Sequence, residues 1–323
     1  MTKSTWVKGL QSGLKTTWML GKVIFPITLF VSILQYTPVL PWLIDLISPV
    51  MGLIGLPGDA AIPLVLGNFL NLYAGIGGIL ALDSLTVKEV FIIAVMLSFC
   101  HNLIIETSVA LKVGVKLWVV LATRIGLALI SAVVINLVWQ GGSEVIQYGG
   151  AVGGEETITG IGAILWNGLA AATTGTLKLA LIIIPLMLVI QIMKDLNWLK
   201  LFSTWMKPVT KMLGMKENTS MTLVAGLVIG LAYGAGVMLE AVREDGVSRK
   251  DITIAFIFLV ACHAVVEDTV IFIPLGVPVI PLLIIRLVTA ILLAMIISRI
   301  WARVDAKKGK VNPSGQENHN PII

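Results

Sequence analysis

Two stretches of the chain, FCHNLIIETSV at residues 99–109 and ACHAVVEDTVI at residues 261–271, set the same polar residues into apolar sequence. In each stretch a Cys-His pair is followed by a carboxylate and a threonine. An ionisable side chain at the centre of a membrane helix costs about 3 kcal/mol on insertion scales and marks a functional site by default. We therefore predict a membrane protein built from two copies of one unit, with these stretches at its centre.

The composition is that of a chain whose main solvent is lipid. Of 323 residues, 57% are apolar and 13% are charged, and the mean hydropathy is +0.96. A soluble domain has about a quarter of its residues charged. Two cysteines exclude a disulfide scaffold, and the apolar fraction excludes a disordered chain. The net charge of +5 lies in a few loops, so we predict no nucleic-acid partner.

Apolar runs long enough to enter or cross a bilayer recur along the chain. The first, Val23 to Leu40, follows four lysines in the manner of a signal peptide. No small-residue cleavage site comes after it, so we predict a retained helix. The further runs cover residues 60–82, 90–111, 117–139, 178–193, 219–239, 252–274 and 276–300.

Loop charges predict which side of the membrane each segment faces. Residues 1–22, 194–217 and 299–310 are rich in Lys and Arg, whereas residues 41–59 and 140–175 carry only acidic charges. Because Lys and Arg are retained on the cytoplasmic side, the basic segments and both termini are predicted to be cytoplasmic.

The second half of the sequence repeats the first, at a shift of 159 residues and, after a short insertion, at a shift of 162. Rare residues match as well as common ones, so chance is a poor explanation. The matched pairs include Pro26 and Pro185, Gly67 and Gly226, Cys100 and Cys262, His101 and His263, and Arg124 and Arg286. The predicted domains are a first repeat at 1–138, an acidic outer linker at 139–163, an inverted second repeat at 164–300 and a disordered cytoplasmic tail at 301–323.

The two copies are predicted to be inverted. The loop at 41–59 is acidic, whereas its counterpart at 200–218 is rich in lysine, so the two face opposite sides. An inverted copy crosses the membrane an odd number of times, yet each copy contains four apolar runs. One run in each copy, 89–111 and 251–274, is therefore predicted to be a re-entrant hairpin or a broken helix.

The predicted fold is thus an all-α polytopic membrane protein of two inverted-topology repeats. Each repeat is predicted to have about three spanning helices, one re-entrant or broken hairpin and one short interfacial helix. The number three follows because one of the four apolar runs in each copy is assigned to the hairpin. The interfacial helices are expected at 5–20 and 164–178, where Trp and Gly-Leu recur.

The polar residues of the two hairpins form the predicted site for a solute or a proton, since a histidine and a carboxylate exchange a proton near neutral pH. Two asparagines without polar counterparts in the second copy are added to the site. The candidates are His101, Glu106, Thr107, His263, Glu267, Asp268, Thr269, Asn68 and Asn71.

The second hairpin is predicted to hold a coupling proton. On a continuous helix His263 and Glu267 lie four residues apart and share one face, whereas Ile105 stands in place of the acid in the first copy. A neighbouring carboxylate favours the charged form of the histidine, and a low dielectric opposes it.

Two other interpretations of the hairpins remain open. In the first, soft and borderline ligands in duplicate bind a divalent transition metal; the ligands would be Cys100, His101, Cys262 and His263. In the second, the charges are structural ion pairs; Glu106 would pair with Arg124, and Asp268 with Arg286.

The helix with Pro26, the GLPGDA stretch at 55–60 and the duplicated Cys-His segments resemble the nucleoside-recognition or Gate-domain membrane proteins. That group includes the YjiH-like and spore maturation proteins, with the membrane core of the ferrous iron transporter as a more distant relative. The resemblance implies a multi-pass protein of the bacterial inner membrane with two Gate repeats. The chain has no G-x-x-x-x-G-K-[ST] nucleotide loop.

We therefore expect a secondary transporter or exporter of a small solute, proton-coupled, with its site between the two hairpin tips. The alternatives are a divalent-metal permease and a non-transporting or lipid-handling factor in envelope or spore assembly. No enzyme motif is present, and the sequence specifies no cofactor. The expected partners are membrane lipids and a small-molecule or ionic substrate, and homodimerisation remains open.

Overall fold

The computed structural model describes residues 3–34, 37, 42, 49–82, 84–146, 160–231, 238–239, 242 and 246–311. Over these residues the chain is helical, apart from its connecting loops and one isolated bridge between Thr86 and Val145. The all-α prediction is therefore confirmed for the described part of the chain. Much of the predicted linker, 147–159, and the end of the predicted tail, 312–323, lie outside the described residues.

The chain forms two compact units, and each draws segments from both copies of the sequence repeat. Unit 1 comprises residues 1–104, 125–195 and 267–283. Unit 2 comprises residues 105–124, 196–266 and 284–323.

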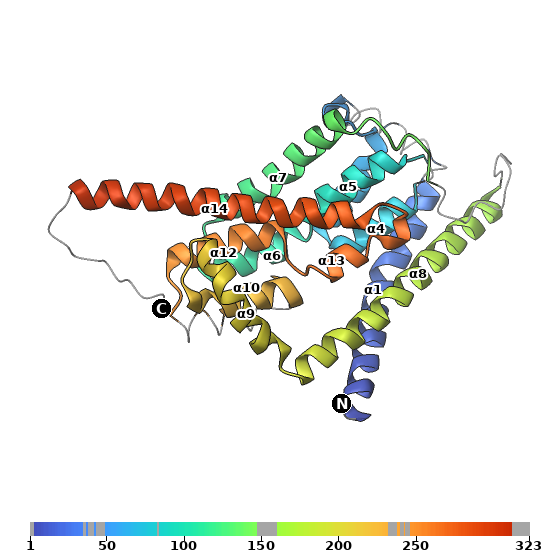
Figure 1. Ribbon diagram of the computed structural model, residues 1–323. Helices are drawn as coiled ribbons and strands as arrows, with labels where there is room; N and C mark the ends of the chain where they lie inside the picture. Colours follow the sequence, from blue (N-terminus) through green and yellow to red (C-terminus); the bar gives the residue numbers. More distant parts are fainter. Residues whose placement is uncertain are drawn as a thin grey trace. The chain divides into compact units, whose positions relative to one another are not determined.

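Helices of both copies make up each unit (Figure 1). Unit 1 contains α1 (Lys3–Leu34), η1 (Gly58–Ala60), α3 (Ala61–Phe69), α4 (Leu72–Leu80), α5 (Val87–Phe99), α8 (Ile161–Asp195), α13 (Glu267–Val270) and η3 (Ile273–Leu275). Unit 2 contains α9 (Trp198–Met212), η2 (Glu217–Thr219), α10 (Ser220–Ile229) and α12 (Arg249–Ala261). Three helices have residues in both units: α6 (Leu103–Lys112), α7 (Leu117–Val138) and α14 (Val279–Val311).

In unit 1, α1 and α8 lie side by side and run antiparallel (Figure 1). A Cβ added at Gly9 would lie 3.1 Å from the Cα of Leu188, and one added at Gly13 would lie 3.0 Å from the Cα of Ile184. The contacts run from Gly9–Leu188 to Gly13–Ile184, so the two helices are antiparallel. The Gly-x-x-x-Gly spacing therefore permits a close backbone approach of the kind that joins membrane helices.

The predicted short helices at 5–20 and 164–178 are the first parts of α1 and α8, so their prediction as separate interfacial elements is wrong. Pro26 and Pro185 lie inside the two long helices. Proline is tolerated in membrane helices because neighbouring groups satisfy the freed backbone carbonyls. The predicted start of a disordered tail at residue 301 is also wrong, because α14 continues to Val311.

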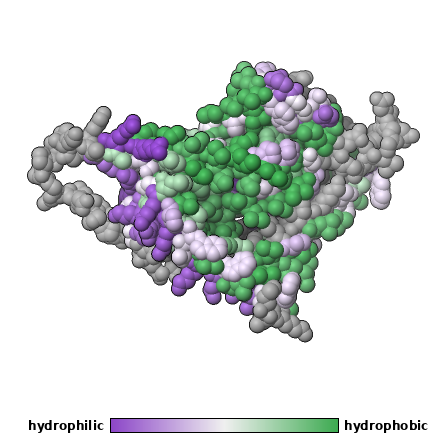
Figure 2. All heavy atoms as spheres, in the orientation of Figure 1, coloured by the Kyte–Doolittle hydropathy of each residue, from purple (hydrophilic) through white to green (hydrophobic). Residues whose placement is uncertain are grey.

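Three described segments are long and apolar enough to cross a membrane: Val87–Lys112, Leu117–Val138 and Val279–Asp305. The first is interrupted between α5 and α6. Along α14, apolar side chains such as Ile284, Leu292 and Ile296 are exposed. Figure 2 shows this apolar surface giving way to hydrophilic residues towards the C-terminal end of the helix. This pattern is expected of a helix that leaves lipid for water.

The two copies recur as matched elements. At a shift of 159, η1 and α3 correspond to η2 and α10, and at a shift of 162, α5 and α7 begin where α12 and α14 begin. The equivalent Gly55 and Gly214 both take positive φ, 76° and 81°. Each faces an equivalent side chain of a later helix, Asn136 in unit 1 and Ser298 in unit 2. The duplication thus extends to local conformation.

Replacing Gly214 by alanine tests this shared turn. The new Cβ would overlap the Ser298 side chain, and a φ of 81° is strained for alanine. We expect the variant to lose about 1–3 kcal/mol of stability and to melt earlier in a thermal denaturation assay in detergent. Gly126→Ala is the matched control, because nothing lies within 4 Å of a Cβ added there. Equal melting of the two variants would contradict this account of the turn.

Candidate functional site

Both predicted hairpins are broken helices, and both break at the same point. Between α5 and α6, and between α12 and α13, a cysteine with non-helical backbone ends the first helix: Cys100 has φ −139° and Cys262 has φ −151°. Two residues later the chain takes a left-handed conformation, with φ 47° at Asn102 and 40° at Ala264. The prediction of broken helices is therefore confirmed, and re-entrance itself stays a prediction.

The backbone freed at each break is bonded to an earlier helix of the same copy, α3 in the first and α10 in the second. The Asn102 N–H donates to the Gly67 carbonyl at 2.8 Å, and the Ala264 N–H donates to the Gly226 carbonyl at 3.0 Å. A Cβ at either glycine would overlap a leucine of the broken helix. The glycines therefore permit the close approach that satisfies these N–H groups at membrane depth.

The two histidines are held in one orientation and one tautomer. Nδ1 of His101 lies 2.6 Å from the Leu97 carbonyl oxygen, and Nδ1 of His263 lies 2.9 Å from the Leu259 carbonyl oxygen. A carbonyl oxygen only accepts, so Nδ1 carries the hydrogen and Nε2 is the basic nitrogen. Both side chains are buried, at 4% and 1% exposure.

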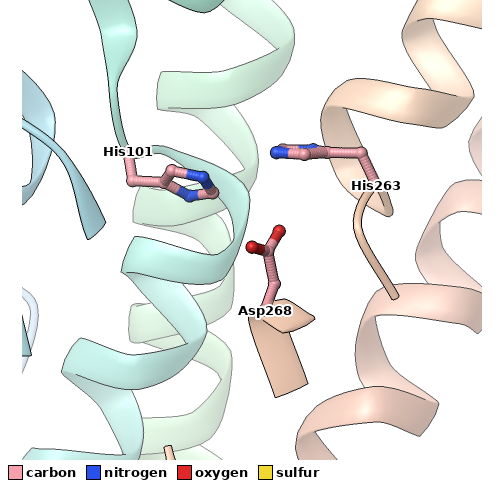
Figure 3. Close-up of side chains that lie close together, drawn as sticks. All are labelled: His101, His263 and Asp268. Carbon is pink, nitrogen blue, oxygen red and sulfur yellow. The ribbon is translucent and has the colours of Figure 1, made fainter. Parts of the chain in front are cut away.

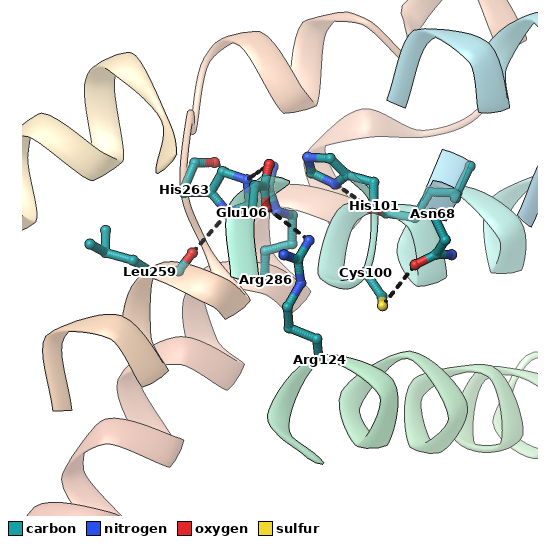
Figure 4. A network of polar contacts seen from close by, with 9 residues as sticks. Asn68, Cys100, His101, Glu106, Arg124, Leu259, His263 and Arg286 are labelled. Atoms are coloured by element: carbon teal, nitrogen blue, oxygen red, sulfur yellow. Dashed lines mark hydrogen bonds and ion pairs between the residues drawn. The ribbon is translucent and has the colours of Figure 1, made fainter. Parts of the chain in front are cut away.

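In unit 2, His263 faces a carboxylate of the other sequence copy (Figure 4). Its Nε2 lies 3.3 Å from Glu106 Oε1. The other oxygen of Glu106 lies 2.8 Å from Nη2 of Arg124, which is fully buried. The Glu106–Arg124 pair agrees with the predicted ion pair. Arg286, also fully buried, donates to the His263 carbonyl at 2.7 Å, and its predicted pairing with Asp268 stays a prediction.

The contact between His263 and Glu106 joins a ring nitrogen to a carboxylate oxygen. With Nδ1–H donated to a carbonyl, Nε2 of the neutral imidazole accepts hydrogen bonds, and so does an ionised carboxylate. Two acceptors 3.3 Å apart in a buried site repel, unless one proton lies between them. A buried histidine that faces a carboxylate in this way is suited to holding a proton.

Unit 1 holds the matching combination. Figure 3 shows the Asp268 carboxylate beside the imidazole of His101, and their ligand atoms lie within 4.8 Å of one another. Both side chains are buried. Again the histidine comes from one sequence copy and the acid from the other. Among the described residues, each unit therefore contains a buried His–carboxylate pair whose members come from different sequence copies.

Tyr73 is a site residue that the sequence interpretation missed. Its hydroxyl donates to Glu267 Oε1 in a buried hydrogen bond within unit 1. Both residues depart from the repeat, because their counterparts are Ala232 and Ile105. The tyrosine is present only in the first copy and the acid only in the second. This matched difference between the copies is the sequence signal that could have identified the Tyr73–Glu267 pair.

The predicted helical face shared by His263 and Glu267 does not exist. The helix α12 ends at Ala261 and α13 begins at Glu267, so His263 lies in the break between them. The spacing rule for neighbours on a helix does not apply across such a break. Nε2 of His263 lies 3.3 Å from Glu106 within unit 2, and Glu267 is bonded to Tyr73 within unit 1.

Asn68, Asn71 and Cys100 have local partners. The Asn71 side chain caps α4 by accepting from the Ala74 N–H at 2.9 Å. The Cys100 thiol donates to Asn68 Oδ1 at 2.9 Å, and Figure 4 shows this contact. These bonds favour structural roles for the two asparagines. The ligand group that includes His101 contains neither cysteine among the described residues.

The remaining predicted residues are buried. Thr107 and Thr269 are 6% and 7% exposed, and Cys262 is fully buried. The Thr107 hydroxyl has no hydrogen-bond partner among the described residues. A buried hydroxyl without a partner is costly, so a solute or water is expected to bond it.

Comparison with known proteins places this site in a family. The family model described as nucleoside recognition, Gate, matches residues 17–116 and 176–290. The chain is 61% identical over 315 residues to an uncharacterized membrane protein, YvoD, of Bacillus subtilis (strain 168), covering 98% of this chain and 99% of that protein. No solved structure matches the chain. The two matched segments contain the two broken helices, and the chain belongs to the nucleoside recognition (Gate) family of membrane proteins.

Proposed function

We propose that this chain is a secondary transporter that exchanges a small solute for a proton across a bacterial inner membrane. The observation that carries the proposal is the buried His263–Glu106 pair at a helix break, 3.3 Å apart. An ionisable pair at membrane depth marks a solute or proton pathway. Discontinuous helices with free half-helix ends are the usual setting of such sites in transporters.

The inverted arrangement of the copies belongs to this proposal. It is supported by the equivalent helices α1 and α8, which run antiparallel within unit 1. It is further supported by the opposite charges of the equivalent loops 41–59 and 200–218. Each copy then begins on the opposite side of the membrane, and both termini are cytoplasmic.

In the proposed cycle, the solute and the proton compete for the His–carboxylate pairs. With the proton bound, His263 and Glu106 are bonded to each other. Without it, Nε2 of His263 and Oε1 of Glu106 both only accept hydrogen bonds, and a donor group of the solute can take the place of the proton between them. A solute with N–H or O–H groups supplies such donors, and the Thr107 hydroxyl can bond it further. Nucleosides have these groups, and the family description makes them the first class to test.

A second candidate, divalent-metal transport, is favoured by one observation. The ligand atoms of His101 and Asp268 lie within 4.8 Å of one another and are buried. Imidazole and carboxylate are common ligands of Zn²⁺, Fe²⁺ and Mn²⁺.

The inversion predicts opposite labelling of two equivalent positions. Gly52 and Lys211 are related by the shift of 159, and both are exposed. In a variant without the native cysteines, we expect a cysteine at position 52 to react with an impermeant maleimide in intact cells. A cysteine at position 211 should react only after the membrane is opened. Equal labelling from outside would contradict the inversion.

The proton site predicts a specific loss on neutralising Glu106. In proteoliposomes with an internal pH dye and a panel of nucleosides, Glu106→Gln should lower solute-driven proton movement by about 100-fold. The matched control is Glu144→Gln, because Glu144 lies in an exposed loop. Thermal melting distinguishes lost transport from lost folding, since the substitution also weakens the Arg124 pair. A folded Glu106→Gln protein with normal proton coupling would overturn the proposal.

For the metal alternative, equilibrium dialysis against Mn²⁺ and Zn²⁺ gives a direct test. Metal transport predicts about one ion bound per chain, lost in both His101→Ala and Asp268→Asn. His319→Ala, in the C-terminal tail, is the control for general histidine binding. Absence of stoichiometric binding to the unaltered protein would exclude this candidate and leave the proton site unaffected.

A further inference from the structure

The helix α9 in unit 2 has three distinct faces. One face packs within the unit against α10 and includes the fully buried Thr210. A second face is apolar and exposed, and a third is basic and exposed. The apolar face consists of Trp198, Leu201, Trp205 and Met212, which are 40%, 44%, 63% and 55% exposed. The basic face consists of Lys200, Lys207 and Lys211.

The aromatic residues of α9 form a continuous row. The ring centroids of Trp198 and Phe202 are 6.1 Å apart, and those of Phe202 and Trp205 are 5.6 Å apart. Tryptophan concentrates where the headgroups of a bilayer meet its hydrocarbon, because the ring is apolar and its N–H is polar. A helix with aromatic residues beside a row of lysines is typical of segments that lie in the plane of that interface.

Comparison of the two sequence copies separates the apolar face from the basic face. Leu201 and Met212 of α9 correspond to Trp42 and Leu53 of the first copy, which are 66% and 78% exposed. The apolar positions therefore recur in both copies. The three lysines correspond to Pro41, Ser48 and Gly52, none of which carries a charge. The basic row is thus an addition in the second copy that the shared fold does not require.

We propose that α9 lies in the interface of the inner leaflet and binds the headgroups of anionic phospholipids through Lys200, Lys207 and Lys211. The inner leaflet is the surface at which the positive-inside rule places this segment, and its anionic lipids attract basic residues. Glu217 pairs with Lys211 and lies 4.0 Å from Lys207, which keeps these two lysines on one side of the helix. This site is separate from the proposed transport pathway and does not depend on it.

Charge distribution favours a lipid surface over a second copy of the chain. In a symmetric dimer through α9, the same face of each copy meets itself, and the lysine row of one copy approaches the lysine row of the other. Like charges brought together in this way oppose association. A lipid surface offers hydrocarbon to the tryptophans and phosphate to the lysines at the same time.

Two neighbouring positions on α9 test its depth in the membrane. Lys200 and Leu201 share one level of the helix but lie on the basic face and the apolar face. In full-length protein with Cys100→Ser and Cys262→Ser, a spin label is placed at either position, and the protein is embedded in nanodiscs containing phosphatidylglycerol. We expect the label at position 201 to be accessible to oxygen, which concentrates in the hydrocarbon. The label at position 200 should be accessible to a water-soluble nickel complex, which stays in water. Water accessibility of both labels would overturn the proposal.

Lipid selectivity tests the lysines. Native mass spectrometry of the full chain with phosphatidylglycerol and phosphatidylcholine should show preferential binding of the anionic lipid. In the K200Q/K207Q/K211Q variant, the preference for phosphatidylglycerol over phosphatidylcholine should fall roughly fivefold for each lysine replaced. The K200R/K207R/K211R variant keeps the charge and should keep the preference. Equal preference in the glutamine variant, or a dimer that Trp205→Ala converts to a monomer, would contradict lipid as the occupant of this face.

Discussion

The structure depends on how backbone groups are satisfied where two buried helices break. In a bilayer no water is available for an exposed N–H group, so a break survives only where protein supplies an acceptor. Here the carbonyls of Gly67 and Gly226 accept from Asn102 and Ala264. The absence of a side chain at each glycine lets a leucine of the broken helix approach closely. The duplicated glycines and the duplicated breaks are therefore parts of one arrangement.

The break also determines the state of the histidines. Each histidine follows the last helical turn and donates through Nδ1 to a carbonyl of that turn. The basic nitrogen Nε2 is left to face another group, which in unit 2 is Glu106. On a regular helix, each histidine would share a face with the residues three and four positions away in its own copy. The broken helix instead pairs a histidine of one copy with an acid of the other, and the buried Arg124 holds that acid in place.

Much of this arrangement could be predicted from the sequence. The repeat located the two broken segments, because cysteine and histidine are rare enough for their pairing to be informative. The Glu106–Arg124 pair was also predicted, since buried charges need partners. The pairing of His263 with Glu106 was not, because helical spacing relates only residues on one continuous helix. Tyr73 was missed for the same reason, as its partner Glu267 is distant in sequence. The extent of α1 and α8 was underestimated because their first parts, residues 5–20 and 164–178, were predicted to be separate interfacial helices.

The central claim is that each break fixes its histidine with hydrogen on Nδ1, so that Nε2 shares a proton with a carboxylate. Solid-state NMR of ¹⁵N-histidine-labelled protein in bilayers reads both ring nitrogens directly, and His101→Gln and His319→Gln variants assign the signals of His263. The account predicts that Nδ1 of His263 carries the hydrogen and that Nε2 is hydrogen-bonded to Glu106. It also predicts that Glu106→Gln shifts the Nε2 signal and leaves Nδ1 protonated. A neutral His263 with hydrogen on Nε2 and none on Nδ1 would contradict the account.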